Sequence, residues 1–168
     1  MPKTIRIYVR SVDAITRFVG RCTMYLIFAI IGVLFYSIFS KSLADPAIWT
    51  LEMAQFLMVA YFMLGGAYAL QQGDHVRMDL FYSRWPAKAR AWVDLATVGL
   101  LMVYLGFLLY GGLSSTWYAL EYNETSYSAW SPQMAPIKVV MCLGTLLMLL
   151  QVLATFFKDL AVARGETL

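Results

Sequence analysis

Four long stretches without a single charged residue limit what this sequence can fold into. They cover residues 22–40, 53–73, 95–120 and 139–157. A helix rises about 1.5 Å per residue, so about 20 apolar residues cross a hydrocarbon core about 30 Å thick. Each stretch is long enough to cross a membrane once and too short to cross it twice. The sequence therefore predicts four transmembrane helices.

The composition excludes a soluble globular domain. Charged residues make up 14% of the 168 residues and hydrophobic residues 61%, whereas a soluble domain is about 25% charged. We expect an all-α integral membrane protein with one membrane domain over residues 1–168. Its spans are expected at about 22–43, 46–72, 93–118 and 137–157. The first apolar stretch starts too late and runs too long for a cleavable signal peptide, so we expect it to remain as the first span.

The basic residues predict the orientation. All 13 except Lys41 and Lys138 fall in segments that share one side of the membrane when the N-terminus is cytoplasmic. Cytoplasmic segments carry an excess of Lys and Arg, so both termini are expected in the cytoplasm. The five tryptophans agree, because all lie near span ends, where amphipathic rings prefer to be. This topology accounts for the net charge of +3, and we expect the lipid bilayer rather than a nucleic acid as a partner.

Two amphipathic segments are predicted outside the spans. In the segment 1–21, one side of a helix would carry Ile5, Tyr8, Val12, Ile15 and Val19, and the other side Arg6, Arg10, Asp13 and Arg17. This spacing predicts a basic amphipathic helix that lies on the inner leaflet or against a partner. A short interfacial helix is expected between spans two and three, at 76–84. Ordinary solvated loop charge explains that second segment equally well.

Span two carries a stripe of small residues. Gly65, Ala69 and Gly73 recur every four residues, with Gly66 beside them. Apolar burial does not drive helices together in lipid, so small residues that let two backbones approach closely matter more. The stripe is either an interface with another subunit or a packing surface within this chain.

Glu52 is the one carboxylate set inside the apolar spans, about one turn below Trp49. A carboxylate at this depth costs free energy unless it faces protein or water. One interpretation is a polar contact or an ion-coupling site. The other is an acid in the first turns of its helix that reaches headgroup water. One shallow carboxylate makes no path through a membrane, so we do not expect ion coupling by this chain alone.

The residues that catalysis requires are nearly absent. His75 is the only histidine, and Cys22 and Cys142 lie near opposite faces of the membrane. This excludes a multi-histidine metal site, and we expect neither an enzyme nor a cofactor in this chain. Two other four-helix classes are the alternatives. A small multidrug-efflux-like transporter needs a carboxylate in its first span, and a membrane thiol oxidoreductase needs cysteine pairs on the outer face.

A series of motifs runs through residues 49–94. It consists of Trp-x-x-Glu, a Gly-Gly-Ala cluster, and Gly-x-His-Val-Arg-x-Asp, followed by a Pro and a basic residue at Pro86 and Arg90. The series resembles the small membrane subunit (DctQ-like) of tripartite ATP-independent periplasmic, or TRAP, transporters. Its residues are our candidates for a subunit interface or structural motif: Trp49, Glu52, Gly65, Gly66, Ala69, Gly73, His75, Arg77 and Asp79.

The resemblance implies partners and a function. In that family the small subunit binds a large permease that carries the substrate and the sodium ions, while a periplasmic binding protein delivers the substrate from outside. The resemblance thus implies a multi-pass protein of the bacterial cytoplasmic (inner) membrane, which scaffolds the large permease for sodium-driven uptake of an organic acid. The sodium gradient would be used by the partner. On the cytoplasmic side, Arg77 and Asp79 are expected to anchor the short helix to the permease or to the adjacent helix ends, while His75 supplies a neutral hydrogen bond. The alternative is that all three are ordinary interfacial polar residues.

Overall fold

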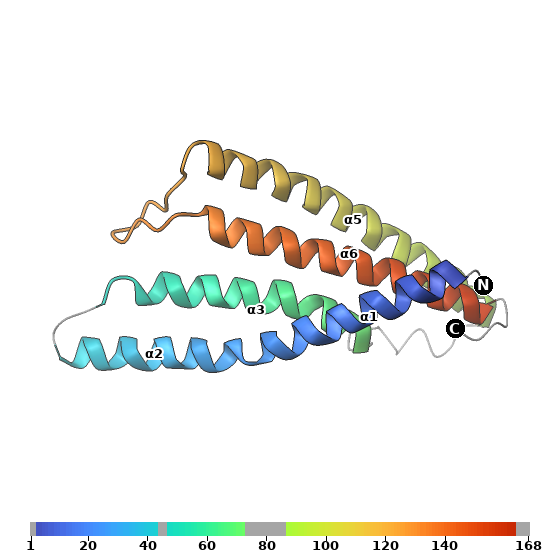
Figure 1. Cartoon of the computed structure of the whole chain (residues 1–168), viewed down its shortest axis with the longest axis horizontal. Coiled ribbons are helices and arrows are strands. Elements are labelled where there is room, and N and C mark those ends of the chain that lie inside the picture. The colour runs from blue at the N-terminus through green and yellow to red at the C-terminus, as the bar shows by residue number, and fades with distance from the viewer. Residues whose placement is uncertain (1–2, 44–46, 73–86, 164–168) are drawn as a thin grey trace.

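The computed structural model describes residues 3–43, 47–72 and 87–163, and most of these are helical (Figure 1). The described helices are α1 (Lys3–Met24), α2 (Leu26–Ser42), α3 (Thr50–Gln72), α5 (Ala87–Glu121) and α6 (Ala135–Ala163). Four segments are long and apolar enough to cross a membrane: Thr4–Ser42, Thr50–Gln72, Ala96–Glu121 and Ala135–Lys158. The prediction of an all-α chain with four such segments is confirmed. The interfacial helix expected at 76–84 lies outside the described residues.

The first of these segments contains two helices. α1 and α2 follow each other with a break at Tyr25, where the chain changes direction (Figure 1). As one helix, the 39 residues of Thr4–Ser42 would be about 58 Å long, roughly twice the thickness of a hydrocarbon core. The 17 residues of α2 are about 26 Å long and come close to that thickness by themselves. This division leaves α1 free to lie across the other helices.

The four long helices form a single layer rather than a closed bundle (Figure 1). The order across the layer is α2, α3, α6, α5, and the extensive contacts are those between neighbours in this order. α1 is the exception, because it crosses both α3 and α6 near one end of the layer. A row of this kind has two broad faces. Apart from the area beneath α1, the described helices leave these faces open.

Close backbone contact joins the two central helices. A Cβ atom on Gly144 of α6 would lie 2.7 Å from the carbonyl carbon and oxygen of Met63 on α3. Backbone atoms cannot move aside as a flexible side chain can, so the helices could not approach this closely with a larger residue. Gly66 of α3 also lacks room for a Cβ atom, because the side chain of Met148 on α6 lies against it. Since lipid is as apolar as these side chains, apolar burial alone would not join the helices, and close packing contributes to their association.

Polar contacts join α2 to the start of α3. The Thr50 hydroxyl donates to the Ser37 hydroxyl at 3.0 Å, and the backbone N–H of Ala47 donates to the Ser40 hydroxyl at 3.0 Å. Residues 47–49 are therefore held in a turn against α2, and the helix begins at Thr50. The span expected at 46–72 thus begins four residues later as a helix.

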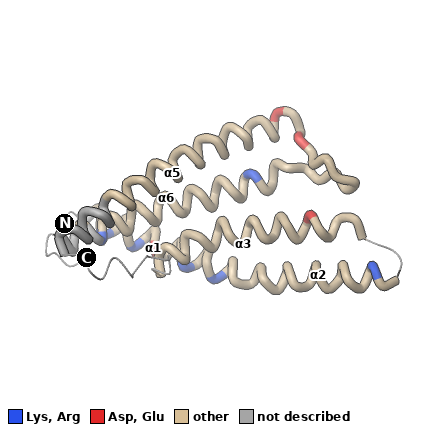
Figure 2. The backbone as a smooth tube through the Cα atoms, turned by 180° about the vertical axis from the view of Figure 1, so that it is seen from behind, with Lys and Arg blue, Asp and Glu red and all other residues tan. Residues whose placement is uncertain are grey.

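At the same end, α5 and α6 are joined by an ion pair between Lys138 and Glu124. From the distribution of basic residues, Lys138 is one of the two expected on the side of the membrane opposite the termini. Its positive charge is thus balanced by an acid of the loop that joins α5 to α6. Figure 2 shows long uncharged lengths along α2, α3, α5 and α6, as expected of segments that cross lipid.

α1 covers part of one broad face with its apolar side. Val9 and Val12 form a buried cluster with Ala154 of α6, and the Tyr8 hydroxyl donates to the carbonyl oxygen of Leu150 at 3.1 Å. We expected this side of the segment 1–21 to meet the inner leaflet or a partner. The structure gives it a neighbour in the same chain.

Candidate functional site

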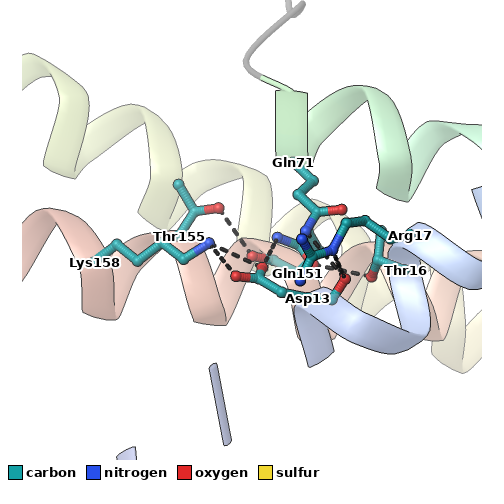
Figure 3. Close-up of polar contacts among 7 residues, drawn as sticks. All are labelled: Asp13, Thr16, Arg17, Gln71, Gln151, Thr155 and Lys158. Atoms are coloured by element: carbon teal, nitrogen blue, oxygen red, sulfur yellow. Dashed lines mark hydrogen bonds and ion pairs between the residues drawn. The ribbon is translucent and has the colours of Figure 1, made fainter. Parts of the chain in front are cut away.

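A cluster of polar side chains lies where α1 crosses α3 and α6 (Figure 3). The Lys158 ammonium of α6 lies 2.7 and 2.9 Å from the two carboxylate oxygens of Asp13 on α1. The Gln151 amide donates to Asp13 Oδ1 at 3.0 Å, and the Thr16 hydroxyl donates to Gln151 Oε1 at 2.9 Å. With Gln71 of α3, described next, these residues are called the crossing cluster: Asp13, Thr16, Gln71, Gln151 and Lys158.

The backbone carbonyl of Asp13 connects the cluster to α3. It accepts hydrogen bonds from Gln71 Nε2 at 3.1 Å and from Arg17 Nε at 3.2 Å. The other amide atom of Gln71, Oε1, is buried and has no hydrogen-bond partner among the described residues. One residue of α1 is therefore bonded to side chains from both central helices of the layer.

Burial makes these contacts matter energetically. Gln151 is completely buried and Thr16 is 1% exposed. A buried polar group without a partner costs about 1–3 kcal/mol, so each of these two residues depends on the other. The side chains of Asp13 and Lys158 are 17% and 36% exposed, so their ion pair is partly screened by surrounding solvent or headgroups. The geometry is that of a structural contact between helices, in which the Asp13 carboxylate already accepts hydrogen bonds from Lys158 and Gln151.

The position of Asp13 corrects the sequence prediction. Helical spacing assigned Asp13 to the polar outer side of α1, together with Arg6 and Arg10, whereas the carboxylate points inward to Lys158. The prediction failed because periodicity sorts residues by polarity and cannot see a partner 145 positions away. One signal was present. Asp13 is the only acid before Asp45, in a segment rich in arginine.

The two candidate residues at the start of α3 lie far from this cluster. Trp49 stacks on Tyr36 of α2, with ring centroids 5.5 Å apart and planes inclined by 31°. Glu52 lies in the first turn of α3, and its Oε2 atom is buried without a hydrogen-bond partner in the part of the chain that the structure describes. A role of Glu52 in a polar contact stays a prediction.

The small residues of α3 lie against helices of this chain. A Cβ on Gly65 would lie 3.7 Å from the Thr23 methyl of α1, and Gly66 meets Met148, while Ala69 is half-buried. Internal packing thus accounts for both glycines, and an additional contact with another subunit stays a prediction. The other candidates lie outside the described residues: Gly73, His75, Arg77 and Asp79.

Neither cysteine forms part of a redox or metal centre in the described structure. Cys22 is exposed, Cys142 is buried, and both are free thiols. The Cys142 sulfur lies 3.3 Å from the Thr116 hydroxyl between α5 and α6, where it is a packing residue. Within residues 3–43, 47–72 and 87–163, no group of three or more His, Cys, Asp or Glu could hold a metal ion.

Four apolar helices arranged in a layer and tied by polar contacts at their ends define a multi-pass membrane protein. More particularly, the chain belongs to the family of "Tripartite ATP-independent periplasmic transporters, DctQ component", whose sequence profile matches residues 30–162. This family is a transporter component, so the chain is not an enzyme. The resemblance drawn from residues 49–94 is confirmed.

Two known proteins are similar to parts of this chain. The sialic acid TRAP transporter small permease protein SiaQ of Vibrio cholerae serotype O1 is 30% identical over 88 residues, which are 52% of this chain and 51% of that protein. The sialic acid TRAP transporter permease protein SiaT of Haemophilus influenzae is 28% identical over 103 residues, which are 61% of this chain and 16% of that protein. The chain thus spans about half of the first relative and a small part of the second.

Proposed function

We propose that this chain is the small permease subunit of a TRAP-type secondary transporter and that it scaffolds the large permease. The observation that carries the proposal is the family match over residues 30–162. The similarity to SiaT adds support, because a segment like this chain occurs there within a much longer permease chain. Two sequences that are joined in one protein are good candidates for direct contact when they occur on separate chains.

In this proposal the partner carries the substrate. The large permease moves an organic acid inward with sodium ions, and a periplasmic binding protein delivers that acid from outside. The small subunit lies in the bacterial inner membrane with both termini in the cytoplasm. The names of both relatives make sialic acid the first organic acid to test.

The described structure supports a static role better than a moving one. The two lysines of α6 lie near its ends, where Lys158 is paired to Asp13 and Lys138 to Glu124. Between these ends the helices are apolar, and the close contact of Gly144 with the Met63 backbone locks the two central helices together. A closely packed apolar layer suits a support against which another subunit moves.

Reconstitution tests this function. Vesicles would contain this chain alone, the large permease of the same transporter alone, or both, each with the binding protein and labelled sialic acid outside. We expect uptake driven by an inward sodium gradient only when both membrane subunits are present. A potassium gradient of equal size is the control. Sodium-driven flux through this chain alone, or equal uptake by the large permease without it, would show the proposal to be wrong.

A further inference from the structure

The side of α5 that faces away from α6 exposes large aromatic residues. Among the described helices, α5 has extensive contacts only with α6. Its opposite side exposes Tyr104, Phe107 and Tyr110, with 62%, 74% and 77% of their surfaces accessible. Neither tyrosine hydroxyl makes a hydrogen bond to a residue that the structure describes. This side of the helix is therefore both apolar and equipped with two unused hydrogen-bonding groups.

The depth of Tyr110 makes its hydroxyl hard to satisfy. Tyr110 lies 11 residues before the end of α5 at Glu121, a distance of about 16 Å along the helix. It also lies within one turn of the middle of the charge-free stretch 95–120. Tyrosines that face lipid sit by preference at the interface, where the hydroxyl reaches water or headgroups. In the hydrocarbon core an unpaired hydroxyl costs free energy, so Tyr110 needs an acceptor from another molecule.

The surface next to Tyr110 has the shape that receives a helix. Val103, Gly106, Phe107 and Tyr110 line a shallow groove on α5. Their spacing of three, four and seven residues is that of four neighbours on one helix face, which form the hole for a side chain of a facing helix. A Cβ on Gly106 would have nothing within 4 Å, so one corner of the hole is open. A lipid tail could fill this space, but it has no acceptor for the Tyr110 hydroxyl.

The outer side of α2 offers a contrast within the same layer. It exposes Phe28, Phe35 and Phe39, which need no hydrogen bond and suit lipid. Gly32 on that helix also has nothing within 4 Å of an added Cβ. Tyr36 of the same helix stacks on Trp49. It lies six residues before the end of α2 at Ser42, about 9 Å along the helix, against about 16 Å for Tyr110 on α5. The two edges of the layer are thus chemically different.

We propose that the outer side of α5, at Val103, Gly106, Phe107 and Tyr110, is the docking surface for one transmembrane helix of the large permease. The partner helix places an apolar side chain in the hole beside Gly106 and offers a hydrogen-bond acceptor to the Tyr110 hydroxyl. The edge formed by α2 faces lipid. This inference rests on the proposed function, because it requires the large permease as a partner.

A matched pair of glycine variants tests the surface. Gly106→Leu fills the hole on α5, and Gly32→Leu adds the same bulk to the outer side of α2. Neither Cβ meets an atom of the described residues, and leucine favours a helix more than glycine does, so neither isolated variant should unfold below the temperature of the wild type. We expect Gly106→Leu to lower recovery of the large permease with the tagged chain in mild detergent at least about tenfold, and Gly32→Leu to leave it unchanged. Tyr110→Phe, which removes only the hydroxyl, should weaken the complex about threefold.

Photo-cross-linking identifies the neighbour of each edge. A benzoylphenylalanine placed at Phe107 should form an adduct with the large permease, and one placed at Phe35 should not. Adducts of Phe107 with a second copy of this chain, or with lipid alone, would overturn the inference.

The two levels of the hypothesis fail in different ways. If the wild-type complex forms and Gly106→Leu leaves it intact, the docking surface is wrong and the proposed function stands. If the wild-type chain recovers no large permease at all, the proposed function fails and the docking surface with it.

Discussion

Removing one partner of the Asp13–Lys158 ion pair should lower the free energy of unfolding by more than the intact pair contributes to it. Asp13→Asn leaves the Lys158 ammonium without the two carboxylate contacts of 2.7 and 2.9 Å, and Lys158→Met leaves Asp13 with the Gln151 amide as its side-chain donor. Breaking a fully buried pair costs about 3–5 kcal/mol, and an exposed pair is worth less than about 1 kcal/mol. The side chains are 17% and 36% exposed, so we expect about 1–2 kcal/mol for each single variant.

Thermal unfolding of the purified chain in detergent measures this cost. A loss of about 1–2 kcal/mol corresponds to a fall in Tm of roughly 2–8 °C for a chain of this size. Arg10→Met is the matched control, because it removes a charge from the exposed side of the same helix and should leave Tm unchanged. The double variant should be less destabilised than the sum of the two single variants, by about 1 kcal/mol. Additive losses, or losses equal to that of the control, would refute the account of the crossing cluster.

Three further outcomes follow from the described contacts. Gln151→Leu removes a donor to Asp13 and the acceptor of Thr16, so it should destabilise the isolated chain by about 1–3 kcal/mol in the same unfolding assay; an unchanged Tm would mean that water satisfies both groups. Gly144→Ala should lower Tm because its Cβ meets backbone, whereas Gly65→Ala should be tolerated with its nearest contact at 3.7 Å; equal effects would contradict the close helix contact. On a background without the native cysteines, Asn123→Cys should react with an impermeant maleimide in intact cells and Gln72→Cys only after permeabilisation, and the reverse pattern would invert the orientation.

The number of helices and their type were predictable from sequence because a span has a fixed minimum length. Four charge-free stretches, each long enough to cross a membrane once, predict four transmembrane helices. The order α2, α3, α6, α5 was not predictable, because helices that are apolar on every side carry no pattern that separates a neighbour from lipid. Glycines marked possible contacts, but sequence could not tell that Gly144 meets the Met63 backbone while Gly32 and Gly106 meet nothing.

The crossing cluster shows a different limit. Gln71 and Gln151 lie in two separate spans, and nothing in their local sequence says that both approach Asp13. The small-residue stripe was easier to interpret, since one of its two interpretations, packing within the chain, fits the contacts of Gly65 and Gly66. Long-range pairing of polar residues depends on the arrangement of whole helices, which is why it appears only in the structure.

Native mass spectrometry of the tagged chain purified from membranes shows whether this chain assembles with a large permease. The large permease of the same transporter would be co-expressed without a tag. We expect a species that contains both proteins and that releases the small subunit only on activation in the instrument. Detection of this chain solely as a monomer or as a homo-oligomer, with the large permease present in the same membranes, would contradict this expectation.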